Sequence, residues 1–192
     1  MNYQNFLCIN QKHKPIPYGG DGVLREDGEA NYGFVCLKGA LELVDVVPEL
    51  VRDAALRQLA IATNSQTTNL LSVGCLSSSV SEGGRHRYTG YFEFAFNSRS
   101  AIADAQNYFP MFFHFDRMLA TIADLRAVTY HWELQPCTFI ERKNATGFSC
   151  GVTVNTHWVS SVDAASKDWE QALGHLTHFL QQVGPPSTDP IY

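Results

Sequence analysis

Two histidines and two glutamates lie at positions from which they could perform chemistry together. His131 lies in an alternating, strand-like segment, and His157 ends a second one. If these segments pair as a hairpin around the polar turn 141–146, His131 comes close to opposite His157. Glu133 shares the face of His131, and Glu93 joins it if a preceding hairpin neighbours this one. These four residues predict a site that holds a metal or divides acid and base roles, with hydrolysis as the natural reaction.

The same residue types are also typical of a strand with one solvated face, where His, Thr, Glu and Asn are expected. Folds that hydrolyse phosphodiesters with two histidines usually place a hydroxyl residue two positions after each histidine. Here those two positions hold Glu133 and Val159, which disfavours a phosphoesterase. The catalytic interpretation of His131, His157, Glu93 and Glu133 therefore remains the alternative to a non-enzymatic function.

Local signatures of the common enzyme classes are absent from the sequence. The segment Gly19-Gly20-Asp21-Gly22 is glycine-rich, but neither Lys-Ser nor Lys-Thr follows it, and no dinucleotide fingerprint opens a helix after a strand. The chain also lacks a nucleophile elbow, a zinc-protease histidine pair and a cysteine-protease signature. We therefore predict no cofactor and no bound metal.

Composition limits the classes of partner. The formal net charge of −5 provides no positive field for a phosphate backbone, which disfavours nucleic-acid binding. The five cysteines are odd in number, widely spaced and without a C-x-x-C pair, so we expect buried, reduced thiols. No apolar run approaches the ~18 residues of a membrane span, and the first residues lack the order of a signal peptide. These features predict a cytoplasmic protein without membrane contact.

A non-enzymatic protein-interaction module is the leading functional prediction, for example a small acidic inhibitor or an immunity-type factor. Hydrophobic residues make up 45% of the chain and form a core, whereas the surface is weakly charged and rich in amides and hydroxyls. Loops on a rigid scaffold usually carry binding residues, so we expect contacts in 16–31, near Gly83 and at Pro110. The predicted contact residues are Tyr91, Asp21, Arg85 and Arg87.

Two alternatives to this function remain open. One is a hydrolase or small-ligand-binding domain that uses the His/Glu cluster on an exposed sheet face. The other is homodimerisation through an open sheet edge, because unpaired strand edges are templates for pairing.

The elements that position these residues follow from hydrophobic periodicity. Paired glycines after Glu82 supply the positive φ of a hairpin turn, and Pro48 suits the first turn of a helix. The sequence predicts strands at 3–9, 34–44, 69–79, 87–97, 128–134 and 148–157. It predicts helices at 47–62, from 101 onwards and at 163–182, and we expect Pro110 to end or kink the second of these helices.

From residue 34 to residue 134 the predicted order is β-α-β-β-α-β. This order resembles the ferredoxin-like arrangement, over roughly half the chain and in topology alone, so it implies no activity. The predicted fold class is α+β: an antiparallel sheet with helices packed on one face, extended by a C-terminal strand and helix. We expect one domain over 1–192, with a strand and loop at 1–32, a core at 33–183 and a loose tail at 184–192.

Overall fold

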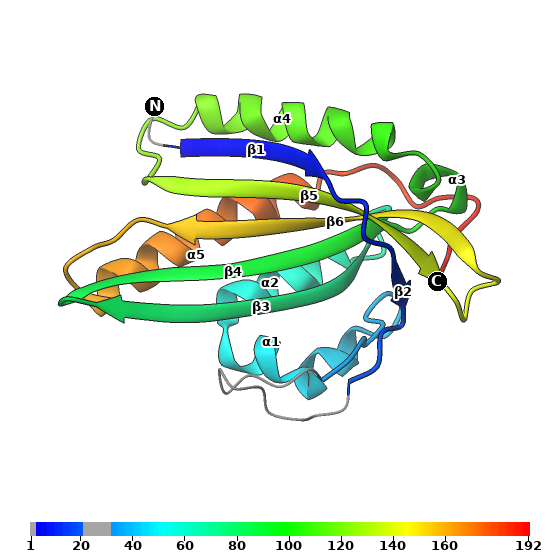
Figure 1. The fold of residues 1–192 in the computed structure, drawn as a ribbon, viewed down its shortest axis with the longest axis horizontal. Coiled ribbons are helices and arrows are strands. Elements are labelled where there is room, and N and C mark those ends of the chain that lie inside the picture. Colours follow the sequence, from blue (N-terminus) through cyan, green and yellow to red (C-terminus); the bar gives the residue numbers. More distant parts are fainter. Residues whose placement is uncertain (1–2, 21–31) are drawn as a thin grey trace.

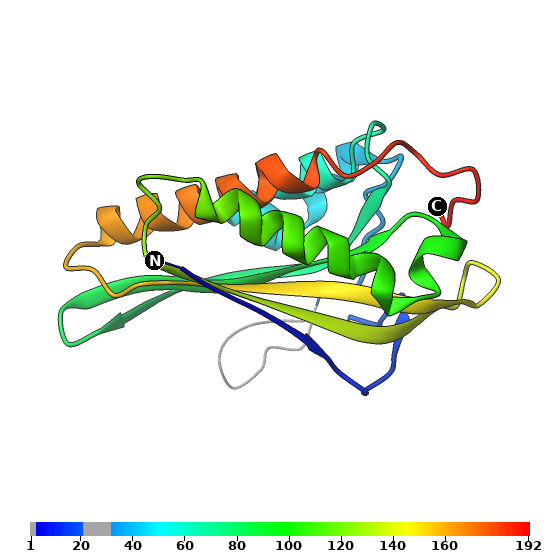
Figure 2. The same ribbon diagram turned by 90° about the horizontal axis from the view of Figure 1, so that it is seen from above.

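The computed structural model describes residues 3–20 and 32–192, which form a mixed α+β fold around one six-stranded sheet. The main helices lie along one face of this sheet (Figures 1 and 2). The strands are β1 (Tyr3–Ile9), β2 (Lys14–Ile16), β3 (Leu70–Glu82), β4 (Arg85–Phe96), β5 (Val128–Phe139) and β6 (Ala145–Thr156). The helices are η1 (Leu41–Val46), α1 (Pro48–Arg52), α2 (Ala54–Thr63), α3 (Arg99–Ile102), η2 (Ala105–Tyr108), α4 (Phe109–Ala120) and α5 (Val162–Leu180).

The strand order is β1-β5-β6-β4-β3, and β2 also pairs with β5. The ferredoxin-like order expected from the sequence is not what the sheet shows. β5 and β6 form a local hairpin, and β6 also pairs antiparallel with β4, so β6 takes a central position. β1 is left at one edge, parallel to β5, and β3 is left at the other edge.

The two long hairpins confirm the strand periodicity of the sequence. β3 and β4 meet at Gly83 and Gly84, whose φ angles of 56° and 73° suit a turn that most residues with a Cβ avoid. β5 and β6 are joined by a loop in which Lys143 and Asn144 also have positive φ. Phe92, like Phe94 and Phe96 two and four residues later, is buried against the helices, as the alternation predicts.

The strand predicted at 34–44 is wrong. These residues pair with no strand, and the chain turns at Gly39, where φ is 80°, before entering η1. The apolar residues of this stretch still enter the core, because Leu37 is 3% exposed and Val44 is 4% exposed. Hydrophobicity therefore marked burial correctly, although the backbone is not a strand.

Two predicted helices are interrupted. The helix expected over 47–62 divides at Asp53, whose extended backbone ends α1 and whose side chain caps α2 by accepting from the Leu56 N–H. The helix expected from 101 onwards is divided into α3, η2 and α4, and η2 ends at Tyr108, shortly before Pro110. Pro110 itself lies in the first turn of α4, where its missing N–H costs no hydrogen bond.

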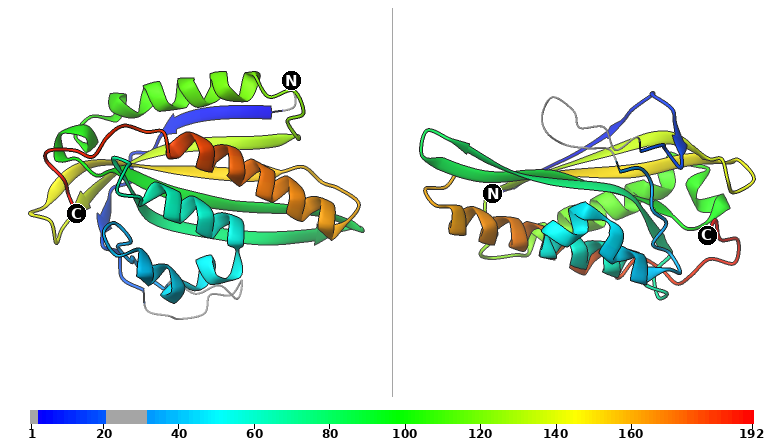
Figure 3. Two further views of the ribbon diagram at one scale, coloured as in Figure 1. Left: turned by 180° about the vertical axis from the view of Figure 1, so that it is seen from behind. Right: turned by 90° about the horizontal axis from the view of Figure 1, so that it is seen from below.

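Trp132 is the centre of the core between the sheet and its helices. Its ring contacts Phe94 of β4, Phe112 and Phe115 of α4, and Phe179 of α5. The amphipathic faces of α4 and α5 thus meet over β5, and Figure 3 shows α2, α4 and α5 side by side on this side of the sheet. We call the opposite side the helix-free face.

The N-terminal segment partly covers the helix-free face. After β1 the chain turns away from the edge of the sheet, and β2 pairs with the second half of β5 (Figure 1). Lys14 contacts the Glu93 carboxylate of β4, which is 7% exposed. The N-terminal segment covers this end of the helix-free face, which explains why Ala95, on the face expected to be solvated, is 0% exposed.

The segment 184–192 is held in place, contrary to the loose tail that we expected. The Asn97 side chain accepts hydrogen bonds from the Ile191 and Tyr192 N–H groups at 2.9 and 2.8 Å. It also donates to the Tyr192 carbonyl at 2.8 Å, and Ile191 is 4% exposed. Arg142 lies 4.2 Å from the centre of the Tyr192 ring.

Over the described residues, no helix has both the length and the apolar character needed to cross a membrane.

Candidate functional site

His131 lies in a row of residues that crosses the helix-free face. Its Cα partners are Phe6 on β1 and Thr153 on β6, and Thr153 in turn pairs with Tyr91 on β4. The expected pairing of His131 with His157 is therefore wrong. His157 follows the end of β6, four residues from Thr153, which corresponds to about 13 Å along an extended chain. The two histidines do not form one site.

Glu93 and Glu133 do lie in one row, on either side of Gly151 of β6. Strand spacing places their Cα atoms about 10 Å apart. Each carboxylate has a partner of its own from the N-terminal segment: Lys14 contacts Glu93, and Asn10 donates to Glu133 Oε1 at 2.9 Å. The predicted cluster therefore divides into separately partnered groups, and His157 is outside it.

The thiol of Cys8, which the sequence predicted to be buried and did not assign to a site, lies beside His131. Cys8 Sγ is 3.2 Å from Nε2 of His131, and Cys8 is exposed. Cys137 and Cys150 are buried, as expected for reduced thiols, but Cys8 departs from that expectation. The alternation of β1 was the available signal, because it places Cys8 and Phe6 on one face and Leu7 on the other. The proximity of Cys8 to His131 depends on the pairing of β1 with β5, which no local pattern in the sequence shows.

The predicted binding residues are dispersed. Arg85 and Arg87 lie at the tip of the β3–β4 hairpin, and both guanidinium groups face the Trp158 ring, at 5.5 and 4.8 Å from its centre. Tyr91 lies further along β4, 37% exposed on the helix-free face. Asp21 is outside the described residues.

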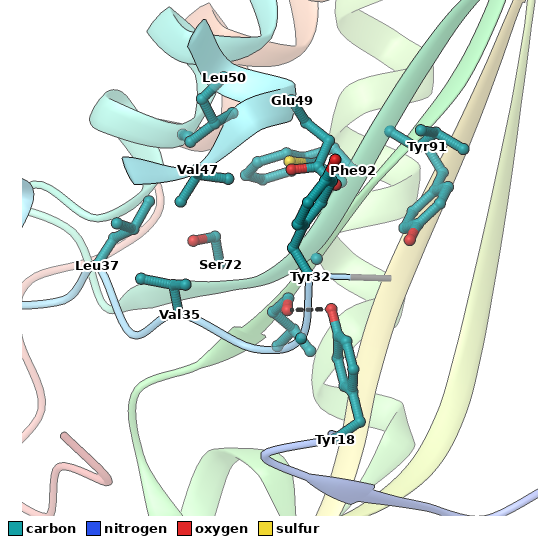
Figure 4. Close-up of a pocket in the computed structure, with 16 residues that line it drawn as sticks. Tyr18, Tyr32, Val35, Leu37, Val47, Glu49, Leu50, Ser72, Tyr91 and Phe92 are labelled. Atoms are coloured by element: carbon teal, nitrogen blue, oxygen red, sulfur yellow. Dashed lines mark hydrogen bonds between the residues drawn. The ribbon is translucent and has the colours of Figure 1, made fainter. Parts of the chain in front are cut away.

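A cavity of about 150 Å³ lies at the β3 edge of the sheet, between β3, α1 and residues 32–37 (Figure 4). We call it the edge pocket. A β-bulge shapes its wall: the register of β3 shifts between Ser72 and Gly74, which leaves the Val73 carbonyl free to accept a hydrogen bond from the Tyr18 hydroxyl at 2.9 Å. Figure 4 marks this bond as a dashed line.

The inner wall of the edge pocket is apolar. Leu37, Leu50 and Phe92 line it and are between 0% and 3% exposed. Val35 and Val47 complete this wall, and Figure 4 shows their side chains on the same side of the cavity. An apolar wall favours the apolar part of a bound molecule.

The outer wall of the edge pocket carries polar groups. Tyr18, Tyr32 and Tyr91 contribute three phenols, of which Tyr32 and Tyr91 are 44% and 37% exposed. Glu49 of α1 contributes a carboxylate, and no lysine, arginine or histidine lines the cavity among the described residues. The ion pairs between described residues involve other acids, namely Glu93, Asp45 and Asp168. Among the described residues that line this wall, Glu49 is therefore the one with a formal charge.

Burial keeps two ionisable side chains of the edge pocket in their neutral, protonated forms. Burial, followed by the charge of Glu49, raises the pKa of the Cys75 thiol to about 12. Burial also raises the pKa of Tyr18, with smaller contributions from Tyr91 and Glu93. Both groups are neutral near pH 7, so neither adds a charge to the pocket, and Glu49 is the acid of its described lining.

Comparison of the chain with protein-family models, with curated proteins and with solved structures finds no match. Over the described residues, no group of three or more His, Cys, Asp or Glu side chains is arranged to hold a metal ion.

Proposed function

We propose that the protein binds a small organic amine with an apolar body in the edge pocket. The observation that supports this function is the combination of an apolar inner wall with an outer wall of three tyrosines and Glu49. Binding sites for small molecules are typically concave and mainly apolar, with a few convergent polar groups that fix orientation. The edge pocket has this composition, and it includes Tyr91, which the sequence analysis named as a binding residue.

The size of the cavity limits the ligand. An apolar cavity of about 150 Å³ in another protein holds benzene. The edge pocket has the same volume, about 150 Å³, so one aromatic ring or a branched aliphatic group fills it. The polar part of the ligand then lies at the partly exposed phenols of Tyr32 and Tyr91.

The charge of the wall selects the polar group. A carboxylate on the ligand would lie near Glu49 without a cation to offset the repulsion, because the described lining contains no basic residue. An ammonium group gains the attraction of Glu49 and of the Tyr32 and Tyr91 ring faces, whereas the Lys14 ammonium already lies 5.6 Å from the centre of the Tyr18 ring. The pocket therefore favours an amine over an alcohol, and an alcohol over a carboxylate.

Three probes that share one phenyl ring and are similar in size test this order: benzylamine, benzyl alcohol and benzoate. Titration calorimetry on the full chain is expected to give the lowest Kd for benzylamine, below about 1 mM. Glu49→Gln is expected to weaken benzylamine at least about tenfold and to leave benzyl alcohol unchanged. Glu141→Gln is the matched control, because Glu141 is exposed in the β5–β6 loop.

A second variant separates binding from folding. Val47→Phe adds volume at the inner wall of the edge pocket, so it should abolish benzylamine binding while the thermal unfolding midpoint stays close to that of the parent. The proposal fails if benzoate binds as well as benzylamine, or if Val47→Phe binds benzylamine with unchanged affinity.

The protein-interaction module predicted from the sequence remains a second candidate function. Its specific support is the hairpin tip, where Arg85 and Arg87 both face Trp158. Arginine and tryptophan are enriched among residues that dominate binding energy at interfaces, and paired guanidinium groups suit an acidic protein segment. The corresponding test is affinity capture from the native host followed by binding of the purified partner. An Arg85→Gln, Arg87→Gln variant that binds the purified partner as tightly as the parent would exclude this surface.

A further inference from the structure

Cys8 differs from the other cysteines in its surroundings. It lies on β1 at one edge of the sheet, exposed on the helix-free face. Cys137 and Cys150 are buried, and Cys36 and Cys75 are half-buried. Reagents in solution therefore reach Cys8 first. Exposure alone does not make a thiol reactive, because the thiolate, and not the thiol, is the nucleophile.

His131 supplies the base that Cys8 needs. Its Nε2 lies 3.2 Å from Cys8 Sγ, within the range of a hydrogen bond to sulfur. In the tautomer with the proton on Nδ1, Nε2 is an acceptor and can take the thiol proton. In the parallel register Phe6 is the Cα partner of His131 and Cys8 is the Cα partner of Glu133, so the contact between Cys8 and His131 runs diagonally between the two strands.

Glu133 determines which reaction this pair favours. Burial and the Glu133 carboxylate raise the pKa of the Cys8 thiol, so the thiol is mainly neutral near pH 7 and depends on His131 for activation. Acyl transfer would also develop an oxyanion close to Glu133, which repels it, and such reactions need aligned donors instead. Exchange with a disulfide develops no oxyanion.

We infer that Cys8 and His131 form a site for thiol–disulfide exchange with small, positively charged disulfides. Cys8 gives its proton to His131 Nε2, and its sulfur attacks one sulfur of the disulfide R–S–S–R. The Cys8–sulfur bond forms as the S–S bond breaks, and the leaving thiolate R–S⁻ takes the proton back from His131. The Cys8 sulfur is oxidised, the leaving sulfur is reduced, and the products are a mixed disulfide and R–SH.

The preference for a positive reagent follows from the neighbouring acids. Glu133 lies beside Cys8, and its partner Asn10 is neutral, so its charge is not offset by that hydrogen bond. Glu93 lies one strand beyond Gly151 but contacts Lys14, which offsets its charge. A positively charged disulfide is attracted to this surface, and a negatively charged one is repelled.

The experiment compares cystamine, a dication, with dithiodipropionate, a dianion. The full-length reduced protein is mixed with each reagent at low ionic strength, and mixed-disulfide formation is followed by mass spectrometry with peptide mapping. We expect Cys8 to be modified first, and several-fold faster by cystamine than by dithiodipropionate. Cys8→Ser should remove the fast phase for both reagents, and Cys36→Ser should leave it unchanged.

Variants of His131 and Glu133 test separately the activation of the Cys8 thiol and the preference for a positively charged disulfide. His131→Gln should slow modification by cystamine at least about tenfold and change the pH profile of the rate, because the thiol then ionises without a base. His13→Gln is the matched control, since His13 contacts Thr138 and not a thiol. Glu133→Gln should bring the rates for the two reagents closer together.

The inference is overturned if His131→Gln and the parent react with cystamine at the same rate, with both proteins shown to be folded by circular dichroism. It is also overturned if dithiodipropionate reacts as fast as cystamine at low ionic strength. Neither result bears on the edge pocket, because no residue is common to the two sites.

Discussion

At the β3 edge of the sheet, a bulge, the Tyr18 hydroxyl and α1 enclose a cavity whose thiol and phenol are kept neutral by burial. At the β1 edge, Cys8 and His131 lie on an open surface, and Phe6 beside them is 50% exposed. The first edge has the properties of a site that holds a molecule without reacting with it. The second has a nucleophile and a base but no enclosing wall. The two proposals therefore assign binding to one edge of the sheet and reactivity to the other.

Both edges depend on the same core, so a change in that core should disrupt both. Trp132→Ala removes a ring that contacts residues from β4, α4 and α5. We expect a loss of about 3–5 kcal/mol in the free energy of unfolding, measured by urea denaturation. A loss below about 1.5 kcal/mol would indicate that the two edges are stabilised independently.

Alkaline pH should lower the stability contributed by the thiol at the β3 edge more than that contributed by the thiol at the β1 edge. The Cys75 thiol has an ordinary pKa of 9.0, which the fold raises to about 12, so its contribution to stability is fully present below pH 9 and is lost as pH rises to 12. Cys75→Ala should therefore lose less stability than the parent between about pH 8 and pH 10, by roughly 1 kcal/mol in urea denaturation. Cys8→Ala, on the open edge, should follow the parent closely. Parallel profiles for all three proteins would contradict the prediction.

Two glycines of one row of the helix-free face should respond differently to a methyl group. A Cβ at Gly74 would lie 2.5 Å from the Tyr18 hydroxyl, whereas at Gly151 the nearest atom is 4.0 Å away. Gly74→Ala should cost about 1–3 kcal/mol of unfolding free energy and weaken benzylamine binding, since Tyr18 must move. Gly151→Ala is the matched control and should change stability by less than about 0.5 kcal/mol. Equal costs for the two would show that Tyr18 does not fix the pocket wall.

The smallest expected effect lies at the open edge. Glu133→Gln removes one of the two causes that raise the pKa of Cys8, so the pKa of this thiol should fall. The expected change is small, because exposed charges are screened by water and salt. Thiolate absorbance in a variant that retains only Cys8 measures it, and adding salt should reduce the difference. A rise in the Cys8 pKa would reverse the assigned sign of the Glu133 effect.

Elements that depend on local pattern were predictable from the sequence. α5 has its apolar residues at helical spacing, and Ser161 caps it, so its extent was close to the expectation for 163–182. The β3–β4 hairpin has a two-glycine turn that fixes where the strands reverse. The β5–β6 hairpin lacks such a marker. Its loop lies at 140–144 and not at 141–146. The centre of the hairpin therefore moves from between residues 143 and 144 to residue 142, and each strand partner moves by three positions.

Features that depend on distant pairing were not predictable. β2 has three residues, one of them Pro15, and exists because β5 offers an edge to it. The contact between Cys8 and His131 likewise joins residues 123 positions apart. The edge pocket depends on a bulge at Val73, whose carbonyl is bound by Tyr18 from a separate segment. The sequence shows which residues are apolar or polar here, but not which segments meet.

The position of β1 has a consequence for how the chain is made. β1 emerges from the ribosome long before its partner strand, which is completed only after more than a hundred further residues, because Cys8 and His131 are 123 positions apart. At elongation rates of about 5–20 residues per second, the first strand waits roughly 6–25 s for β5. During that interval Phe6, Cys8 and Ile9 have no sheet to join. Nascent chains are then accessible to chaperones, and to thiol reagents, at the same surface that the finished protein presents beside His131.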